Sequence, residues 1–168
     1  MKARTFTAVA ALTTFAACLG LPSVASAQQY LPAATAQGAS GIEGAGSGLQ
    51  RARTRVRVGL ELRVDESPED AIAGAVLVDV EPRAAFGAEI RYVRAVTPNL
   101  AIGGGAIGYF APALLVGPSV GVEARIPIGK KTYFAIGPDV AVFALGSDLP
   151  DNTIIWQALL QGGIRVDL

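Results

Sequence analysis

Histidine is absent from this 168-residue chain, and cysteine occurs only once, at Cys18. The absence of histidine removes histidine-dependent catalytic triads and most transition-metal sites. A carboxylate pair for hydrolysis could in principle come from Glu123, Asp139 and Asp79. Their charges are instead matched by arginines at similar positions in the pattern. We therefore expect no catalytic residue, no metal ligands and no cofactor. The chain is predicted not to be an enzyme.

Lysine is also scarce, because after Lys2 it occurs only in the pair Lys130 and Lys131. The whole chain carries 14 basic and 14 acidic residues. Without Lys2 and Arg4, which fall in the N-terminal segment described next, 12 basic and 14 acidic residues remain. This balance gives no bulk attraction to nucleic acid, so no nucleic-acid partner is expected.

The N-terminus has the organisation of a secretory signal peptide. Two basic residues precede an apolar run over residues 6–21, and the small residues Ala25 and Ala27 follow it. We predict a signal peptide at residues 1–27, with cleavage before Gln28. Such cleavage removes the single cysteine, so the mature chain is expected to lack thiols and disulfides.

A lipoprotein signal is the alternative at this terminus. The sequence Phe15-Ala16-Ala17-Cys18 is similar to a lipobox, in which the cysteine is lipidated and becomes the first residue. Phe15 stands where an aliphatic residue is usual, and a well-formed cleavage site follows. Signal cleavage before Gln28 is therefore favoured.

The remaining chain divides into two parts. Residues 28–50 are rich in Gly, Ala, Ser and Gln and have few large apolar side chains, which predicts a flexible lead-in. Residues 51–168 form a single predicted domain. Its first segment, 51–65, alternates apolar residues with arginines and acids at period two, which is typical of a β-strand.

Six further strands are expected, separated by short clusters of turn residues. Short links between consecutive strands favour antiparallel hairpins, so the fold class is predicted to be all-β, an up-and-down meander. Seven strands are visible and barrels usually have an even number, so an eighth could come from 38–48 to close a small barrel. The six strands are 71–80, 85–95, 100–110, 114–126, 132–145 and 153–168.

The two faces of these strands differ consistently. One carries Val, Ile, Leu and aromatic residues, and the other carries small residues and charges of both signs. In a soluble sandwich the charged face is the solvated outside, whereas in a membrane barrel it lines the interior. Because lysine is scarce and arginine suits buried ion pairs, the membrane barrel is favoured. The predicted charge network of its lumen is Arg57, Glu61, Arg63, Asp79, Glu89, Arg91, Glu123, Arg125, Asp139, Arg165 and Asp167.

Over residues 51–168 the sequence resembles the small outer-membrane β-barrels of the OmpA and OmpX kind, including opacity-like proteins. The features are the signal peptide, the alternating strands, a strand, turn and strand from Arg91 through Thr97-Pro98-Asn99, and an alternating final segment. The family's last residue is typically aromatic, whereas here it is Leu168. The resemblance implies a Gram-negative outer-membrane location, with membrane lipid and the barrel-assembly machinery as partners.

Together these observations predict a structural outer-membrane β-barrel with a charge-networked, plugged lumen. The alternative is a soluble periplasmic or secreted β-barrel or sandwich that binds a hydrophobic ligand or a protein partner. If eight strands close, the turns at 97–99 and 129–131 lie at the same end as the C-terminus. The loops at 111–113 and 146–152 then lie at the other end.

Overall fold

The computed structural model describes residues 30–46, 48–64, 67–147, 149 and 153–168. The predicted signal peptide, its cleavage residues and Cys18 lie outside these ranges. Every regular element in the described part of the chain is a β-strand. No helix among the described residues is long and apolar enough to cross a membrane.

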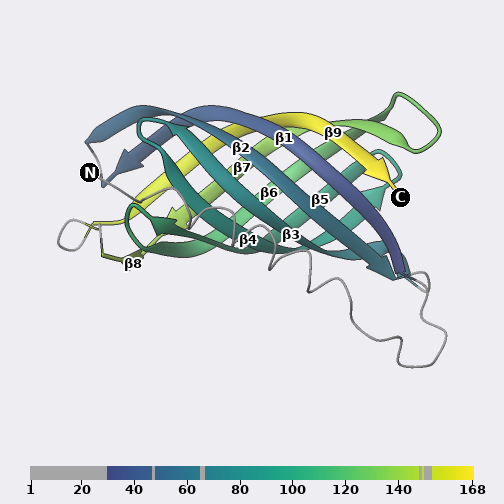
Figure 1. Ribbon diagram of the computed structural model, residues 1–168, viewed down its shortest axis with the longest axis horizontal. Coiled ribbons are helices and arrows are strands. Elements are labelled where there is room, and N and C mark those ends of the chain that lie inside the picture. The colour runs from purple at the N-terminus through teal and green to yellow at the C-terminus, as the bar shows by residue number, and fades with distance from the viewer. Residues whose placement is uncertain (1–29, 47, 65–66, 148, 150–152) are drawn as a thin grey trace, which may run out of the picture.

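Eight long strands form a closed antiparallel barrel (Figure 1). Each pairs with its neighbour in the chain, and β1 closes the ring by pairing with β9. The two-residue strand β8 pairs only with β6. The predicted all-β, up-and-down barrel is confirmed. The strands are β1 (Tyr30–Ala45), β2 (Leu49–Val64), β3 (Ser67–Glu81), β4 (Ala85–Thr97), β5 (Leu100–Ala111), β6 (Leu115–Pro127), β7 (Thr132–Phe143), β8 (Leu145–Gly146) and β9 (Ile155–Asp167).

The prediction of a flexible lead-in is wrong for β1, which is the eighth strand and is longer than the candidate at 38–48. The composition of this segment was misleading because β1 is stabilised by pairing on both sides. It pairs with β2 from Tyr30–Val64 to Ala45–Leu49 and with β9 from Ala33–Asp167 to Ala45–Ile155. This pairing removes two exposed sheet edges and satisfies backbone groups that small side chains leave accessible. Large apolar residues are not required for it.

The chain direction fixes which connections share an end of the barrel. Because β1 starts beside the last residues of β9, the end where β9 finishes also carries the turns at 98–99 and 128–131. We call this the terminal end. The opposite end carries the turn at 46–48 and the links at 82–84, 112–114 and 144–154. The grouping matches the arrangement expected for eight strands.

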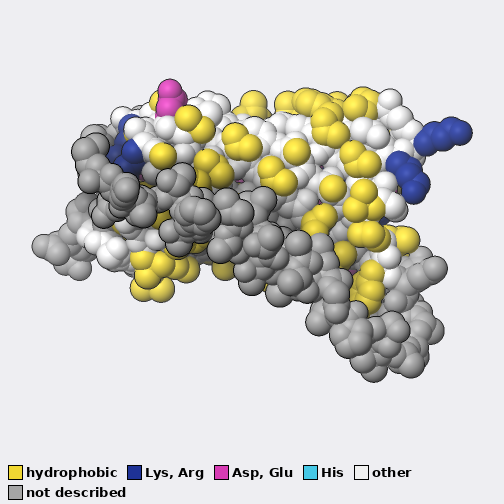
Figure 2. Space-filling view, in the orientation of Figure 1, with side chains coloured by type: hydrophobic (Ala, Val, Ile, Leu, Met, Phe, Trp, Pro, Cys, Tyr) yellow, Lys and Arg dark blue, Asp and Glu magenta, His cyan; other side chains and the backbone are white. Residues whose placement is uncertain are grey.

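The period-two pattern separates an inner from an outer face on every long strand. Along β3, for example, Ala71, Ala73 and Ala75 are buried, whereas Ile72 and Val76 are exposed. Figure 2 shows hydrophobic side chains over the barrel wall, with the visible Lys, Arg, Asp and Glu side chains gathered at its two ends. The barrel wall thus has an apolar exterior, and the charged side chains lie in the interior or toward the two ends.

Candidate functional site in the barrel interior

The inward-facing side chains form a continuous array of arginines, carboxylates and amides. Arg165 is 2% exposed and Asp79 is fully buried. The strand pleat places them there, because residues two apart on one strand share a face. Three groups of ion pairs follow one another along the barrel.

The first group lies toward the terminal end and centres on Glu61 of β2. Glu61 accepts hydrogen bonds from Nη2 of Arg125 and Nη2 of Arg165, each at 3.0 Å. Arg125 also donates through Nε to Glu123 at 2.7 Å. Asp167 lies 2.6 Å from Nη1 of Arg165 and 3.1 Å from Nη2 of Arg63. Three arginines and three carboxylates balance one another in this group.

The second group lies near the middle of the barrel and centres on Glu89 of β4. Glu89 accepts from Nε of Arg57 at 3.0 Å, from Nε of Arg91 at 2.5 Å and from the hydroxyl of Ser119 at 2.9 Å. Arg91 also donates to Asp139 of β7. Two arginines and two carboxylates therefore balance here as well.

Gln37 of β1 joins the first two groups. Its side-chain oxygen accepts from Nη1 of Arg57 at 2.6 Å, and its amide nitrogen donates to Glu123 at 2.8 Å. An amide suits this position because it both donates and accepts. The two groups are thereby part of one hydrogen-bonded network.

The third group lies toward the opposite end and holds Arg51, Arg53 and Arg55 of β2. Asp79 of β3 accepts from Arg53 and, at 3.0 Å, from Nε of Arg55. Glu43 of β1 accepts from Nε of Arg51 at 2.6 Å and from Arg53. Gln157 of β9 donates to Glu43 at 2.7 Å and accepts from Arg55.

An apolar cluster shares this half of the interior with the third group. It includes Leu77, Ile107 and Leu115, all buried. Tyr109 and Phe143 belong to it too, with ring centroids 5.7 Å apart. The guanidinium carbons of Arg53 and Arg55 lie 5.0 and 5.6 Å from the centroid of the Tyr109 ring, within the range of cation–π attraction. Tyr109 therefore joins the charged and apolar parts of this half.

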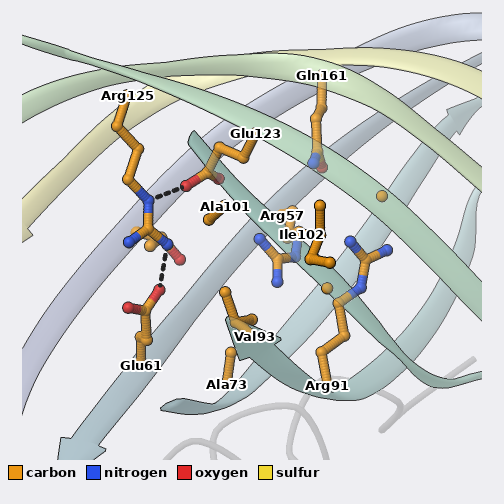
Figure 3. A pocket seen from close by; sticks show the side chains of 13 residues that line it. Arg57, Glu61, Ala73, Arg91, Val93, Ala101, Ile102, Glu123, Arg125 and Gln161 are labelled. Carbon is orange, nitrogen blue, oxygen red and sulfur yellow. Dashed lines mark hydrogen bonds and ion pairs between the residues drawn. The ribbon is translucent and has the colours of Figure 1, made fainter. Parts of the chain in front are cut away.

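Little empty space remains among the first two groups. Between the first two groups a cavity of about 30 Å³ remains, bordered by Arg57, Arg91, Arg125 and Gln161. Figure 3 shows these side chains around it, with Arg125 bonded to Glu123 and Glu61. A water molecule needs roughly 10–15 Å³ of such space, so the cavity has room for about two or three waters.

The structure places all eleven residues of the predicted network on the inner face. Ten of them pair with another member, as Arg57 does with Glu89 and Arg63 with Asp167. Asp79 is the exception, since its partners Arg53 and Arg55 were not among the predicted residues.

The residues that sequence reasoning missed are Glu43, Arg51, Arg53 and Arg55 and the uncharged Gln37, Ser119, Gln157 and Gln161. Arg53 and Arg55 were recoverable, because they share the parity of Arg57 on one strand. Glu43 and Gln37 lie on β1, of which only 38–48 was proposed as a candidate strand, without an assignment of its two faces.

The carboxylates considered as catalytic candidates belong to these ion-pair groups. Glu123, Asp139 and Asp79, considered above as a hydrolytic pair, each accept hydrogen bonds from arginine. No group of three or more potential metal-ligating residues occurs within the described ranges. The geometry is that of a structural ion-pair network, which satisfies buried charges by pairing them.

Comparison with known proteins bears on the fold alone. No protein-family model and no curated protein matches the chain. Among solved structures, the chain is similar to Neisserial surface protein A, with a TM-score of 0.52 and 11% sequence identity. The match covers 85% of this chain and 100% of that one. The barrel resemblance expected from the sequence is confirmed at the level of fold.

Proposed function

We propose that this chain is a structural β-barrel of the bacterial outer membrane, with strands that cross the bilayer and a lumen closed by its own side chains. The observation that carries the proposal is the inversion of polarity across the barrel wall. Large apolar side chains are exposed on all eight long strands, among them Val58, Ile72, Ile90 and Leu160. Arginines and carboxylates fill the interior instead.

An apolar exterior of this extent is costly in water. Soluble monomers rarely expose contiguous apolar patches larger than a few hundred Å². A membrane-spanning barrel requires such a surface, together with closed backbone pairing that leaves no free strand edge. In the soluble alternative the apolar face would be the core, but here it is the outer surface.

The charge network supports a closed lumen. Three groups of ion pairs succeed one another along the axis, an apolar cluster packs beside the third, and the cavity between the first two has room for only a few waters. We therefore infer a stabilising role for the interior charges and neither transport nor catalysis. Outer-membrane lipid and the barrel-assembly machinery are the partners that this proposal requires.

Trp156, the single tryptophan of the chain, provides a direct test. It lies on the outer face of β9 near the opposite end, because a Cβ at its outward-facing partner Gly44 would lie 2.5 Å from the Trp156 ring. In vesicles of phosphatidylcholine brominated at defined acyl positions, its fluorescence should be quenched most by bromines near the headgroup. Vesicles of unbrominated lipid are the control. An emission insensitive to bromine at every depth would contradict the membrane assignment.

A further inference from the structure

A second cavity, of about 210 Å³, lies at the opposite end of the barrel. Residues from separate connections border it, including Arg51 after the first turn, Arg83 between β3 and β4, and Ala113 between β5 and β6. It is lined by none of the residues around the 30 Å³ cavity. This end of the molecule therefore carries a distinct concave site, which we call the mouth cavity.

One wall of the mouth cavity is cationic. Arg51, Arg53 and Arg83 line it, and no Asp or Glu does so among the described residues. The third ion-pair group behind this wall has three arginines but only Glu43 and Asp79 as its own carboxylates. Arg55 also lies 4.0 Å from Asp139, a carboxylate that Arg91 already holds. Among the described ion pairs the other two groups balance, so the one arginine in excess belongs to the group beside this cavity.

The rest of the described lining is largely apolar. Ala85, Ala111, Leu115 and Ile155 contribute to it. Tyr109 also lines the cavity, and its ring lies within cation–π range of Arg53 and Arg55. The mouth cavity thus combines a surplus of cationic donors with an apolar surface.

We propose that the mouth cavity binds a small organic anion that has an apolar body, such as an aromatic or short aliphatic carboxylate. Arginine guanidinium groups bind carboxylates through strong, charge-assisted hydrogen bonds. A site built this way holds the ligand by charge on one side and by apolar contact on the other. An apolar cavity of about 150 Å³ accommodates benzene, so a ring bearing one carboxylate fits the mouth cavity.

Benzoate is the probe for this site. The purified full chain, folded in micelles of the uncharged detergent dodecyl maltoside, is titrated with benzoate in a calorimeter. We expect saturable binding of one benzoate per chain. Benzyl alcohol lacks the charge and acetate lacks the ring, so each should bind about tenfold more weakly or not detectably. Absence of saturable benzoate binding would overturn the proposal.

Two variants locate the binding. Arg51→Gln and Arg83→Gln should each weaken benzoate binding about tenfold, the value of one charge-assisted hydrogen bond. The matched control is Arg94→Gln, because Arg94 lies on β4 toward the terminal end and is outside the cavity lining. A heat-dependent shift in gel mobility shows that each variant is folded. Unchanged binding in both variants, or equal weakening in the control, would contradict the assignment.

The benzoate titration is independent of the membrane proposal. It is carried out in micelles and does not depend on which side of a bilayer this end faces. If benzoate fails to bind while brominated lipids quench Trp156, the site is refuted and the outer-membrane proposal stands. The opposite pair of results would retain the site on a barrel that does not cross a membrane.

Discussion

At the scale of a single residue, Asp79 shows how the interior charges affect the stability of the barrel. Its carboxylate is fully buried, and it accepts hydrogen bonds from Arg53 and Arg55 on the neighbouring strand. Burying an ionised group without partners is strongly unfavourable, and removal of one partner leaves the other charge uncompensated. The inward charges therefore depend on one another for stability.

Asp79→Asn should lower the free energy of unfolding by about 3–5 kcal/mol, because two buried arginines lose the negative charge between them. Asp70→Asn is the matched control, since Asp70 pairs at 3.7 Å with Arg94, whose side chain is 55% exposed. That exposed pair should contribute less than about 1 kcal/mol. Urea unfolding in micelles, followed by Trp156 fluorescence, measures both. Equal losses in the two variants would contradict a stabilising network.

At the scale of the strand, inward-facing glycines let neighbouring backbones approach closely. A Cβ on Gly117 or on Gly137 would lie 1.8 Å from a carbonyl oxygen of the adjacent strand. Gly41, Gly59, Gly87, Gly105 and Gly163 show similar contacts, so seven of the eight long strands carry such a position. Glycine within a strand commonly marks a bend or a close backbone approach. These positions let the sheet close into a small barrel.

Gly137→Ala should therefore prevent folding or reduce its yield strongly, since the new methyl group would overlap the carbonyl oxygen of Val122. Gly74→Ala is the control, because Gly74 faces outward on β3 and a Cβ there meets nothing within 4 Å. The control should change stability by no more than about 1 kcal/mol. The fraction that refolds into the heat-shifted gel form tests both variants. A Gly137→Ala chain that refolds like wild type would rule out this role.

The strand scale also shows how far the sequence could predict this fold. In the segment from Arg51 to Val64 the alternation is local, so it was recognised, and with it the parity of Arg57, Glu61 and Arg63. In β1 the alternation involves Ala, Gly and Ser, whose hydrophobicity contrast is too small to see. Its order comes from pairing with β9, a contact between distant parts of the chain. Glu43 and Gln37 were missed for the same reason.

At the scale of the whole molecule, the barrel wall separates an apolar exterior from a charged interior. Val120 lies near the centre of β6 and is 58% exposed, and Ile126 lies near its end and is 51% exposed. Both face outward on one strand, and they differ mainly in their distance from the barrel's end. If the barrel lies in a bilayer, the cost of a charged substitution at these two positions should therefore depend on their depth in the membrane.

In a bilayer, Val120→Arg should destabilise the barrel by about 2–4 kcal/mol and Ile126→Arg by about 0–1 kcal/mol, because the cost of a cation rises toward the midplane. In water, two exposed positions would accept arginine with changes within about 0.5 kcal/mol. Unfolding titrations in phospholipid vesicles measure the difference. Equal, small effects at both positions would show that this wall does not face lipid.

The most direct test of the central claim is the gel mobility, unboiled and boiled in SDS, of the outer-membrane fraction from cells that express the full chain. A closed barrel resists the detergent until it is heated, so the protein should be found in that fraction and shift in mobility on boiling. Recovery of the protein from the soluble periplasm or the medium, with no shift on boiling, would contradict the account.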